Sequence, residues 1–428
     1  MLGSIFRSIK RKLFFLVAGY FRFWASLKLK RWSPKIIVVT GSAGKTTLLH
    51  LIEAQLGSEA HYSHHANSAY GIPFDILGMT GVRKSRLDWI GLILKTPFKA
   101  FTKPYTEKLY VAEVDADRPK EGAFLAKLLK PDVTLWVSSL HTHATSFDAL
   151  VSAGKFKTTE EAIAFEYGNL LAVTKELVVQ NGDSELMHAQ LPRTKAKVEE
   201  VFASSLNSYK TQHAQTTFEF ENKTFTIPAL VPKATFYQVA MVQKLLEYLN
   251  HEPDANFSKF VLPPGRSNVF EGIKGTTLID STYNNSNFDS LREIVEMFEL
   301  YEAGKKWAVI GDILDQGKDE SSVHQKIASL LENTHFERII LFGPRVIEYT
   351  LPLLSEELKN RTVITSFDKP VDVLKYLQAN LSGGEAVAFK GVRFLEGVIQ
   401  KLLKNPEDAA LLPRRDPVWQ KYLKEWGL

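Results

Sequence analysis

The chain of 428 residues contains no cysteine. Without thiols there is no disulfide framework, thiolate zinc site, iron–sulfur cluster or cysteine nucleophile, and a reducing compartment is permitted. Glycine and proline are ordinary at 25 and 18 residues, which excludes collagen-like and low-complexity chains. The sequence also lacks a fixed-period repeat. With 45% hydrophobic residues it is that of a globular protein, and its length suggests two or three domains.

Acidic residues are missing from the first 35 positions, which carry nine Lys or Arg. Since the whole chain has a net charge of +5, the remaining residues sum to −4. A mildly acidic body does not suit a nucleic-acid surface spread over the fold. We therefore expect no nucleic-acid partner.

A hydrophobic run long enough to cross a bilayer is absent at the N-terminus. Residues 13–27 would form a helix of roughly 22 Å, against a hydrocarbon core of ~30 Å, and they include Arg22. Their apolar residues recur at helical spacing: Leu13, Leu16, Val17, Tyr20, Phe21, Trp24 and Leu27. Three interpretations stay open: a helix packed on its own protein, a helix lying among lipid headgroups, and the less favoured signal peptide. We expect a cytoplasmic protein, with contact to the inner face of the membrane through residues 1–33 as a hypothesis.

Residues 35–56 read as a β-branched strand, a glycine-rich turn and a helix. Such a turn surrounds a polyphosphate with backbone N–H groups, while Lys45 meets the β/γ oxygens and Thr46 binds Mg²⁺. Val39 stands where the longer form of this loop has glycine, so this is a short variant, T-G-S-x-G-K-T-T. The predicted nucleotide cradle is Gly41, Ser42, Ala43, Gly44, Lys45, Thr46 and Thr47.

The short loop resembles that of the Mur ligase superfamily, whose members make peptide bonds with ATP during cell-wall precursor synthesis. Residues 67–78, NSAYGIPFDILG, are similar to a segment of its MurF type, and Asn67 is kept. The resemblance implies that Asn67 binds substrate, although a plain loop explains the segment about as well.

Residues 109–147 have the strand, helix, strand rhythm of a parallel sheet, and Glu113 lies where its first strand ends. By resemblance Glu113 ligates magnesium together with Thr46. His143, with Phe147 in an H-x-x-x-F pattern, would support a second metal. We interpret His64, His65 and His141 as surface or core histidines rather than a zinc cluster.

Residues 160–173 depart from the family pattern. Members usually carry a lysine that is carbamylated to bridge two Mg²⁺ ions, and Tyr167 stands at that position. A phenol cannot form a carbamate. Second-metal binding would use another group, such as Glu166 or water, or be weak.

Further motifs lie in the second half of the chain. By resemblance Gln238 contacts adenine, Arg266 of P-P-G-R meets the γ-phosphate, and Asp280 contacts ribose. An always-charged guanidinium suits developing phosphoryl charge. Segments around residues 283, 312 and 390 match MurF motifs in order and spacing. The implied substrate-binding residues are Asn67, Tyr283, Asn284, Asp312, Lys390 and Arg393, and the implied catalytic residues are Lys45, Glu113, His143 and Arg266.

The expected fold is α/β: a phosphate-loop ATPase central domain with a parallel sheet, and a smaller Rossmann-like C-terminal domain. We predict a basic helix over 1–33, the central domain over 34–264 and the C-terminal domain over 265–428. The MurF domain that holds the UDP end of the substrate is not recognised ahead of the loop.

The resemblance implies a ligase that adds D-alanyl-D-alanine to a UDP-muramyl tripeptide through an acyl phosphate. It implies ATP and Mg²⁺ as cofactors, a nucleotide-sugar peptide and a dipeptide as substrates, and we expect a monomer. Two alternatives stay open. One is a related ligase with another acceptor, such as a folylpolyglutamate-synthase-like enzyme. The other is a catalytically weakened ATP-binding partner subunit, which Tyr167 favours.

Overall fold

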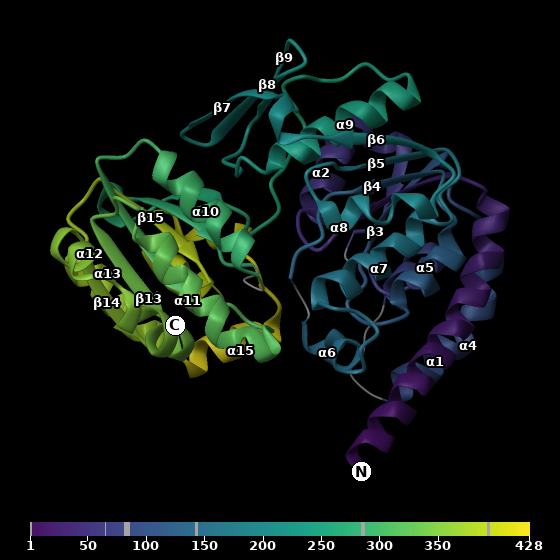
Figure 1. Cartoon of the computed structure of the whole chain (residues 1–428), viewed down its shortest axis with the longest axis horizontal. Helices are drawn as coiled ribbons and strands as arrows, with labels where there is room; N and C mark the ends of the chain where they lie inside the picture. Colours follow the sequence, from purple (N-terminus) through teal and green to yellow (C-terminus); the bar gives the residue numbers. More distant parts are fainter. Residues whose placement is uncertain (1, 65, 81–85, 142–143, 284–286, 392–393) are drawn as a thin grey trace. The chain divides into compact units, whose positions relative to one another are not determined.

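The computed structural model describes the whole chain except residues 1, 65, 81–85, 142–143, 284–286 and 392–393 (Figure 1). The described chain forms two compact units that interleave along the sequence. The first comprises Met1–Ser139, Ala149–Ala203 and Tyr237–Pro253, and the second comprises Leu140–Asp148, Ser204–Phe236 and Asp254–Leu428. The domain bounds expected from the sequence, 34–264 and 265–428, are continuous segments, whereas these two units interleave; the expected bounds stay a prediction.

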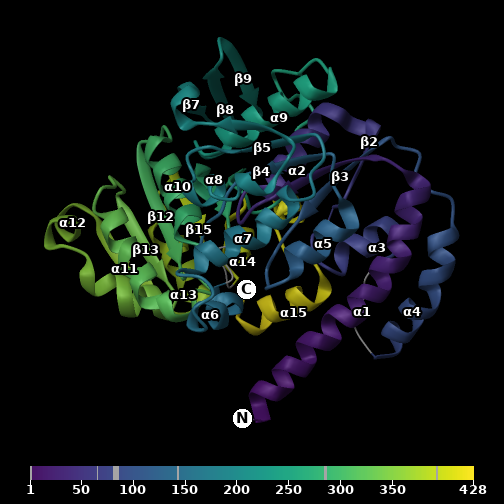
Figure 2. The same cartoon turned by 45° about the vertical axis from the view of Figure 1, so that its right-hand side comes forward.

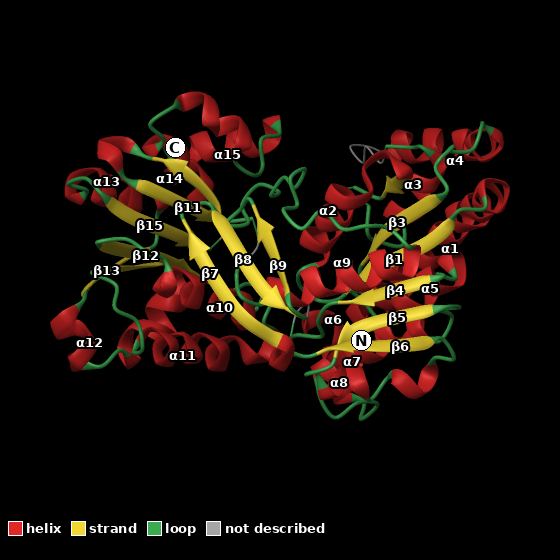
Figure 3. Ribbon diagram, turned by 90° about the horizontal axis from the view of Figure 1, so that it is seen from above, coloured by secondary structure: helices red, strands yellow, loops and turns green. Residues whose placement is uncertain are grey.

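The first unit is built on a six-stranded parallel sheet in the order β2-β3-β1-β4-β5-β6, of which Figure 3 labels every strand but β2. Its central strands are runs of β-branched and other apolar residues that are buried on both faces, as parallel strands are. Because parallel strands end at one edge, the loops after β1 and β3 lie together there. The strands are β1 (Lys35–Thr40), β2 (Ala60–Tyr62), β3 (Leu109–Val114), β4 (Val133–Trp136), β5 (Leu177–Asn181) and β6 (Lys197–Val201).

Helices cover this sheet on both faces. Ile36 and Val38 of β1 face a cluster that includes α1, α3 and α5, while the alternating Ile37 and Val39 point to the other face. The helices are α1 (Leu2–Trp32), α2 (Lys45–Leu56), α3 (Gly71–Leu77), α4 (Arg86–Phe101), α5 (Glu121–Leu129), α7 (Thr159–Leu171), α8 (Glu185–His188) and α9 (Thr235–Leu249); α6 (Ala144–Ser152) spans the two units.

Helix α1 packs on its own protein along its second half. Ala18, Phe21, Ala25, Leu29 and Trp32 are buried against the first unit. Of the expected apolar stripe, Phe21 is buried and Val17, Tyr20 and Trp24 pack against the same cluster, whereas Leu16 is 71% exposed; the two buried alanines were not part of the expectation. Small alanine side chains let α1 approach α3 closely, which a count of large apolar residues does not register.

The second unit holds a sheet in the order β10-β11-β15-β12-β13-β14, in which only β10 runs antiparallel to its described neighbour. Its strands are β10 (Asn268–Glu271), β11 (Thr277–Ser281), β12 (Lys305–Gly311), β13 (Arg338–Phe342), β14 (Val363–Phe367) and β15 (Glu385–Lys390). Its helices are α10 (Phe288–Leu300), α11 (Glu320–Leu331), α12 (Glu356–Arg361), α13 (Pro370–Asn380), α14 (Leu395–Leu402) and α15 (Pro417–Glu425).

A small antiparallel sheet completes the second unit, with strands β7 (Leu206–Gln212), β8 (Gln215–Phe220) and β9 (Lys223–Ile227). The expected fold class, an α/β chain with a parallel central sheet and a second sheet domain, is confirmed. Among the helices that the structure describes, none combines the length and the hydropathy needed to cross a membrane.

Candidate nucleotide site

The glycine-rich loop joins β1 to α2 with two glycines in the left-handed region. Gly41 has φ 136° and Gly44 has φ 81°, so neither position suits a residue with a side chain. Gly44 precedes Lys45, the first residue of α2. Thr46 and Thr47 follow in the first turn, where backbone N–H groups and the helix dipole favour an anion.

Ser138, after β4, holds the loop against the neighbouring strand. The N–H of Ser42 donates to the Ser138 carbonyl at 3.0 Å, and the N–H of Ala43 donates to Ser138 Oγ at 2.9 Å. A Cβ on Gly41 would meet the backbone of Ser138 at 2.9 Å. The loop is therefore fixed by contacts with β4 as well as by its own turn.

Lys45 is buried and points back under the loop. Its Nζ donates to the Gly41 carbonyl at 2.6 Å and lies 2.9 Å from Oδ2 of Asp115. Burial lowers the pKa of Lys45, but Asp115 and Glu113 outweigh it and raise the pKa above its usual value. Lys45 therefore carries a positive charge at neutral pH, as a phosphate ligand must.

Glu113 and Thr46 supply oxygen ligands of the kind that Mg²⁺ prefers. Thr46 Oγ1 donates to Glu113 Oε1 at 3.2 Å, and the Glu113 side chain is buried. The N–H of Glu113 donates to Ser63 Oγ at 2.8 Å, which fixes the strand end. A hydroxyl and a carboxylate beside a buried lysine fit a magnesium–polyphosphate group.

Tyr167 reaches the same cluster from α7. It is fully buried, and its hydroxyl donates to Oδ1 of Asp115 at 2.8 Å. Burial, followed by the charge of Asp115, raises the pKa of Tyr167 well above its usual value, so the phenol stays protonated. Glu166 instead accepts from the N–H of Lys120 at 2.7 Å, at the start of α5. Of these two residues of α7, Tyr167 is therefore the one that contacts Asp115.

Gln238, near the start of α9, packs on the glycine-rich loop. A Cβ on Gly44 would lie 2.1 Å from Gln238 Nε2. The side chain is buried, and no described residue hydrogen bonds its Oε1. Gln238 therefore has a carboxamide oxygen at the nucleotide loop that can accept a hydrogen bond, as a contact with the adenine base requires.

Arg266 and Tyr283 lie together in the second unit. The Arg266 guanidinium stands 4.9 Å from the centre of the Tyr283 ring, and a Cβ on Gly265 would meet Tyr283 at 2.8 Å. Arg414, near the C-terminus, donates to the carbonyl of Thr282 at 3.0 Å and also to that of Tyr283. The C-terminal tail therefore fixes the loop that carries Tyr283.

Asp280 lies one residue before the end of β11 and is fully buried. Its Oδ1 accepts from the N–H and the hydroxyl of Thr282 at 2.9 and 2.7 Å, while Oδ2 has no hydrogen-bond partner among the described residues. Burial raises the pKa of Asp280 to about 6. Burial also lowers the pKa of Lys390 to about 8, and its Nζ donates to Ser290 Oγ at 3.1 Å.

Asp312 is committed to the framework of the second unit. Its Oδ1 accepts from the N–H groups of Arg345 and Val346, each at 3.0 Å. His324 accepts the N–H of Ile313 at Nε2 and contacts the Glu320 carbonyl through Nδ1, at 3.0 and 2.7 Å. The motif around residue 312 thus holds the turn after β12 in place.

The structure brings Lys45, Thr46, Glu113 and Gln238 together in the first unit, and Arg266 with Tyr283 in the second. Asn67 contributes its carbonyl, which accepts from the N–H of Asp115 at 2.8 Å. His143, Asn284 and Arg393 lie outside the described residues.

Three residues that shape the site were not predicted from the sequence: Asp115, Ser138 and Arg414. The sequence did contain a feature that points to Asp115, because this residue follows Glu113 by two positions at the carboxyl end of a parallel strand, where ligands bind. No local sequence pattern points to Ser138 or Arg414, because the residues that they hydrogen bond lie 95 and 132 positions away in the sequence.

Comparison with known proteins gives matches to both halves of the chain. Residues 265–393 match the family described as Mur ligase, glutamate ligase domain. The chain is 22% identical over 400 residues to UDP-N-acetylmuramoyl-tripeptide--D-alanyl-D-alanine ligase of Bacillus subtilis, covering 89% of this chain and 79% of that protein. The protein of the same name from Borreliella burgdorferi is 22% identical over 389 residues, covering 86% and 74%.

Solved structures share the fold. The crystal structure of MurF ligase from Thermotoga maritima in complex with ADP has a TM-score of 0.68 and 22% identity, covering 95% of this chain and 84% of that one. MurF from Acinetobacter baumannii has a TM-score of 0.70 and 16% identity, covering 89% and 79%. At these identities the likeness shows the fold.

Proposed function

We propose that this chain, a member of the Mur ligase superfamily, is an ATP-dependent ligase of cell-wall precursor synthesis. The proposed reaction joins D-alanyl-D-alanine to a UDP-muramyl tripeptide, the activity that the names of the curated relatives state. The observation that carries the proposal is the buried Lys45 at the start of α2, with Thr46 of the same helix and Glu113 of β3 near it. A monomer in the cytoplasm is part of the same proposal.

The proposed chemistry makes demands that these side chains meet. A substrate carboxylate attacks the γ-phosphate of ATP, ADP leaves, and the amine of the dipeptide displaces phosphate from the acyl phosphate. Because two anions approach each other, positive charge must offset them. Lys45 supplies it in the first unit, and Arg266 is the proposed γ-phosphate contact in the second. Mg²⁺, bound through Thr46 and Glu113, would neutralise further phosphate charge.

The remaining assignments stay proposals. Gln238 and Asp280 are the proposed adenine and ribose contacts, and His143 the proposed support of a second metal. The proposed substrate contacts are Asn67, Tyr283, Asn284, Asp312, Lys390 and Arg393. For Asp312, the hydrogen bonds to Arg345 and Val346 favour positioning of the neighbouring loop over direct contact.

Phosphate release from Mg-ATP tests the proposal. UDP-N-acetylmuramoyl-tripeptide and D-alanyl-D-alanine are supplied together and then each omitted. We expect release only with both, and no release from Lys45→Ala, while the exposed Lys421→Ala serves as the matched control. Release without either acceptor substrate, or full activity of Lys45→Ala, would contradict the proposal.

A second candidate is a nucleotide-binding subunit that lacks turnover, favoured by Tyr167 at the position of the carbamylated lysine. ATP binding without phosphate release, with release restored by Tyr167→Lys in bicarbonate buffer, would support it. ATP binding and release that needs a different acceptor would instead support the related-ligase alternative.

A further inference from the structure

Helix α4 exposes a stripe of large apolar side chains. Ile90, Leu94, Phe98 and Phe101 recur at spacings of four, four and three residues, which places them on one side of the helix. Phe98 is 79% exposed and Leu94 66% exposed. Single exposed leucines are ordinary, but a continuous stripe of this kind marks an interaction surface.

The stripe is fixed by the opposite side of α4. Trp89, Leu92 and Ala100 pack into the core of the first unit, and Thr96 Oγ1 donates to the Leu92 carbonyl at 2.7 Å. Because this side packs against the core, α4 cannot turn its exposed stripe inward without losing those contacts. The exposure therefore belongs to the folded protein.

Helix α1 continues the surface beside α4 (Figures 1 and 2). Tyr20 OH donates to the Ile93 carbonyl at 2.8 Å, and the Trp24 ring meets the Phe101 ring edge-on at 6.2 Å. On its exposed side α1 adds Leu16 and Phe23. We call this surface the apolar face; it comprises Leu16, Phe23, Ile90, Ile93, Leu94, Phe98 and Phe101.

Positive charge is concentrated in the segments that carry the apolar face. Residues 1–35 and 81–106 together hold fifteen Lys or Arg and one acidic residue, Asp88, which leaves −9 for the rest of the chain. Lys95, Lys99 and Lys103 are exposed on or next to α4. Apolar side chains bordered by cations complement a bilayer with anionic headgroups.

We propose that the apolar face docks on an anionic lipid surface, with α1 and α4 lying in the plane of the headgroups. Phe98, Leu94 and Ile90 enter the boundary between headgroups and acyl chains, and the lysines contact lipid phosphates. This extends the hypothesis of membrane contact from residues 1–33 to α4. It does not depend on the ligase activity.

Sedimentation with vesicles tests the lipid surface. Full-length protein is mixed with vesicles of phosphatidylglycerol and phosphatidylcholine in equal amounts, or of phosphatidylcholine alone. We expect pelleting with the anionic vesicles, weakened by salt. The variant Leu94→Glu with Phe98→Glu should reduce the vesicle partition constant at least about tenfold, because two apolar side chains no longer leave water.

The matched control carries Leu300→Glu and Leu353→Glu, which add the same charge at exposed apolar positions of the second unit. Its vesicle binding should equal that of the unchanged protein. Equal binding by both variants would overturn the proposal. A second result would also overturn it: the unchanged protein does not bind vesicles but is a dimer by light scattering, and Leu94→Glu with Phe98→Glu is a monomer. The apolar face would then be an interface between two copies.

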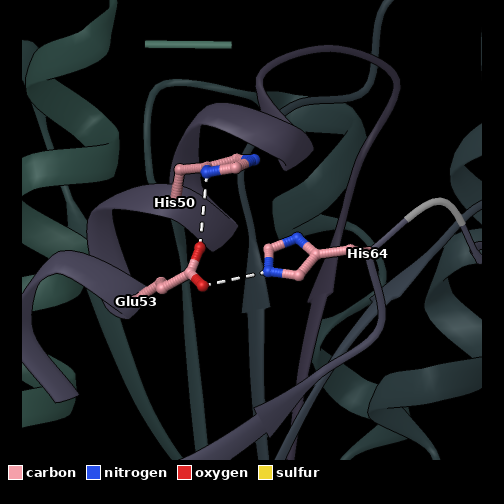
Figure 4. A group of neighbouring side chains, drawn as sticks. All are labelled: His50, Glu53 and His64. Atoms are coloured by element: carbon pink, nitrogen blue, oxygen red, sulfur yellow. Dashed lines mark hydrogen bonds and ion pairs between the residues drawn. The ribbon is translucent and has the colours of Figure 1, made fainter. Parts of the chain in front are cut away.

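A separate cluster combines two imidazoles and one carboxylate (Figure 4). His50 and Glu53 lie one turn apart on α2, and His64 follows β2. Glu53 lies between the rings: its Oε2 is 3.4 Å from His50 Nδ1, and its Oε1 is 3.0 Å from His64 Nε2. One ligand atom from each residue lies within 4.8 Å of the other two.

This donor set is the one that zinc favours. Two histidine nitrogens and a carboxylate oxygen form a three-ligand zinc site that leaves a fourth position for water. The side chains are half-buried, so an ion can reach them from solvent. Tyr62 stacks on the His64 ring at 5.8 Å, which helps to hold that imidazole in place.

We infer that His50, Glu53 and His64 bind one Zn²⁺ ion. Of the three histidines considered in the sequence, His64 belongs to this site, His141 lies 3.6 Å from Asp319 in the second unit, and His65 lies outside the described residues. Nitrogen ligands also separate this site from the oxygen ligands at Glu113, which suit Mg²⁺.

Calorimetric titration of the full chain with Zn²⁺, in the presence of Mg²⁺, tests this site. We expect one saturable ion, and His64→Gln should weaken its affinity at least about tenfold. The control is His335→Ala, which removes an exposed histidine paired with a single glutamate, Glu299, at 2.8 Å. Absence of saturable binding, or an affinity unchanged by His64→Gln, would overturn the inference. Zn²⁺ should also raise the melting temperature of the control but not of His64→Gln.

Discussion

Tyr167 donates a hydrogen bond of 2.8 Å to Asp115, across 52 residues of sequence. The other oxygen of Asp115 pairs with Lys45, so the phenol and the ammonium hold one carboxylate from two sides. A lysine at position 167 would bring a second cation to this carboxylate. Tyrosine instead gives Asp115 a neutral donor, so the hydrogen bond adds no positive charge beside Lys45.

Tyr167→Phe should destabilise the protein by about 1.5 to 3 kcal/mol, because it removes a buried hydrogen bond to an ion-paired carboxylate. Tyr209→Phe is the control, since that hydroxyl donates to the neutral carbonyl of Val231 at 2.9 Å. The control should lose about 1 kcal/mol. Urea unfolding compares the two, and a loss for Tyr167→Phe no greater than for the control would refute the charge-assisted bond.

Gly44→Ala should abolish nucleotide binding in a titration with a fluorescent ATP analogue. The left-handed backbone at Gly44 disfavours a side chain by about 1 to 2 kcal/mol, and the new Cβ would lie 2.1 Å from Gln238 Nε2. Gly154→Ala shares the backbone strain at φ 69° but meets nothing within 4 Å, so it should bind the analogue normally. Normal binding by Gly44→Ala would show that the loop is not the nucleotide cradle.

Glu113→Gln should raise the Mg²⁺ concentration needed for half-maximal phosphate release by roughly tenfold or more. The amide keeps an oxygen near Thr46 but loses the negative charge that attracts the ion. Glu59→Gln, an exposed change in the same unit, should leave the magnesium dependence as it was. An unchanged dependence for Glu113→Gln would remove this residue from the metal site.

Asp280 should make stability fall as pH rises from about 4 to about 6. Burial raises its pKa to about 6, above the ordinary 3.8, so the folded state holds the proton more tightly than the unfolded state in this window. Ionisation across it should lower the free energy of unfolding by about 2 to 3 kcal/mol.

Asp280→Asn should flatten this part of the profile, measured as melting temperature against pH. Asp368→Asn, at an exposed position, should leave the profile as it is in the unchanged protein. If Asp280→Asn keeps the full fall in stability, another buried group must titrate there.

Local patterns determined the strand, turn and helix around Lys45, because the glycine-rich turn and its helix are contiguous in sequence. The resemblance to the Mur ligases and the α/β class followed from motifs of the same kind, which need only order and spacing. The matches to MurF proteins agree with the resemblance, and the two sheets agree with the predicted α/β class.

Tertiary structure alone decided the partners of the site and the placement of α1. Asp115 meets Tyr167 only because the fold brings the residue after β3 to helix α7, and no local pattern records that contact. Hydropathy at helical spacing predicted the helix at the N-terminus and part of its packed side, including Phe21, but it left out Ala18 and Ala25 and included the exposed Leu16. Ala18 and Ala25 face the core because small side chains allow close helix packing, whereas the large apolar residues of α4 face outward. Hydropathy fixes that a helix has an apolar side; which side is covered depends on what packs against it.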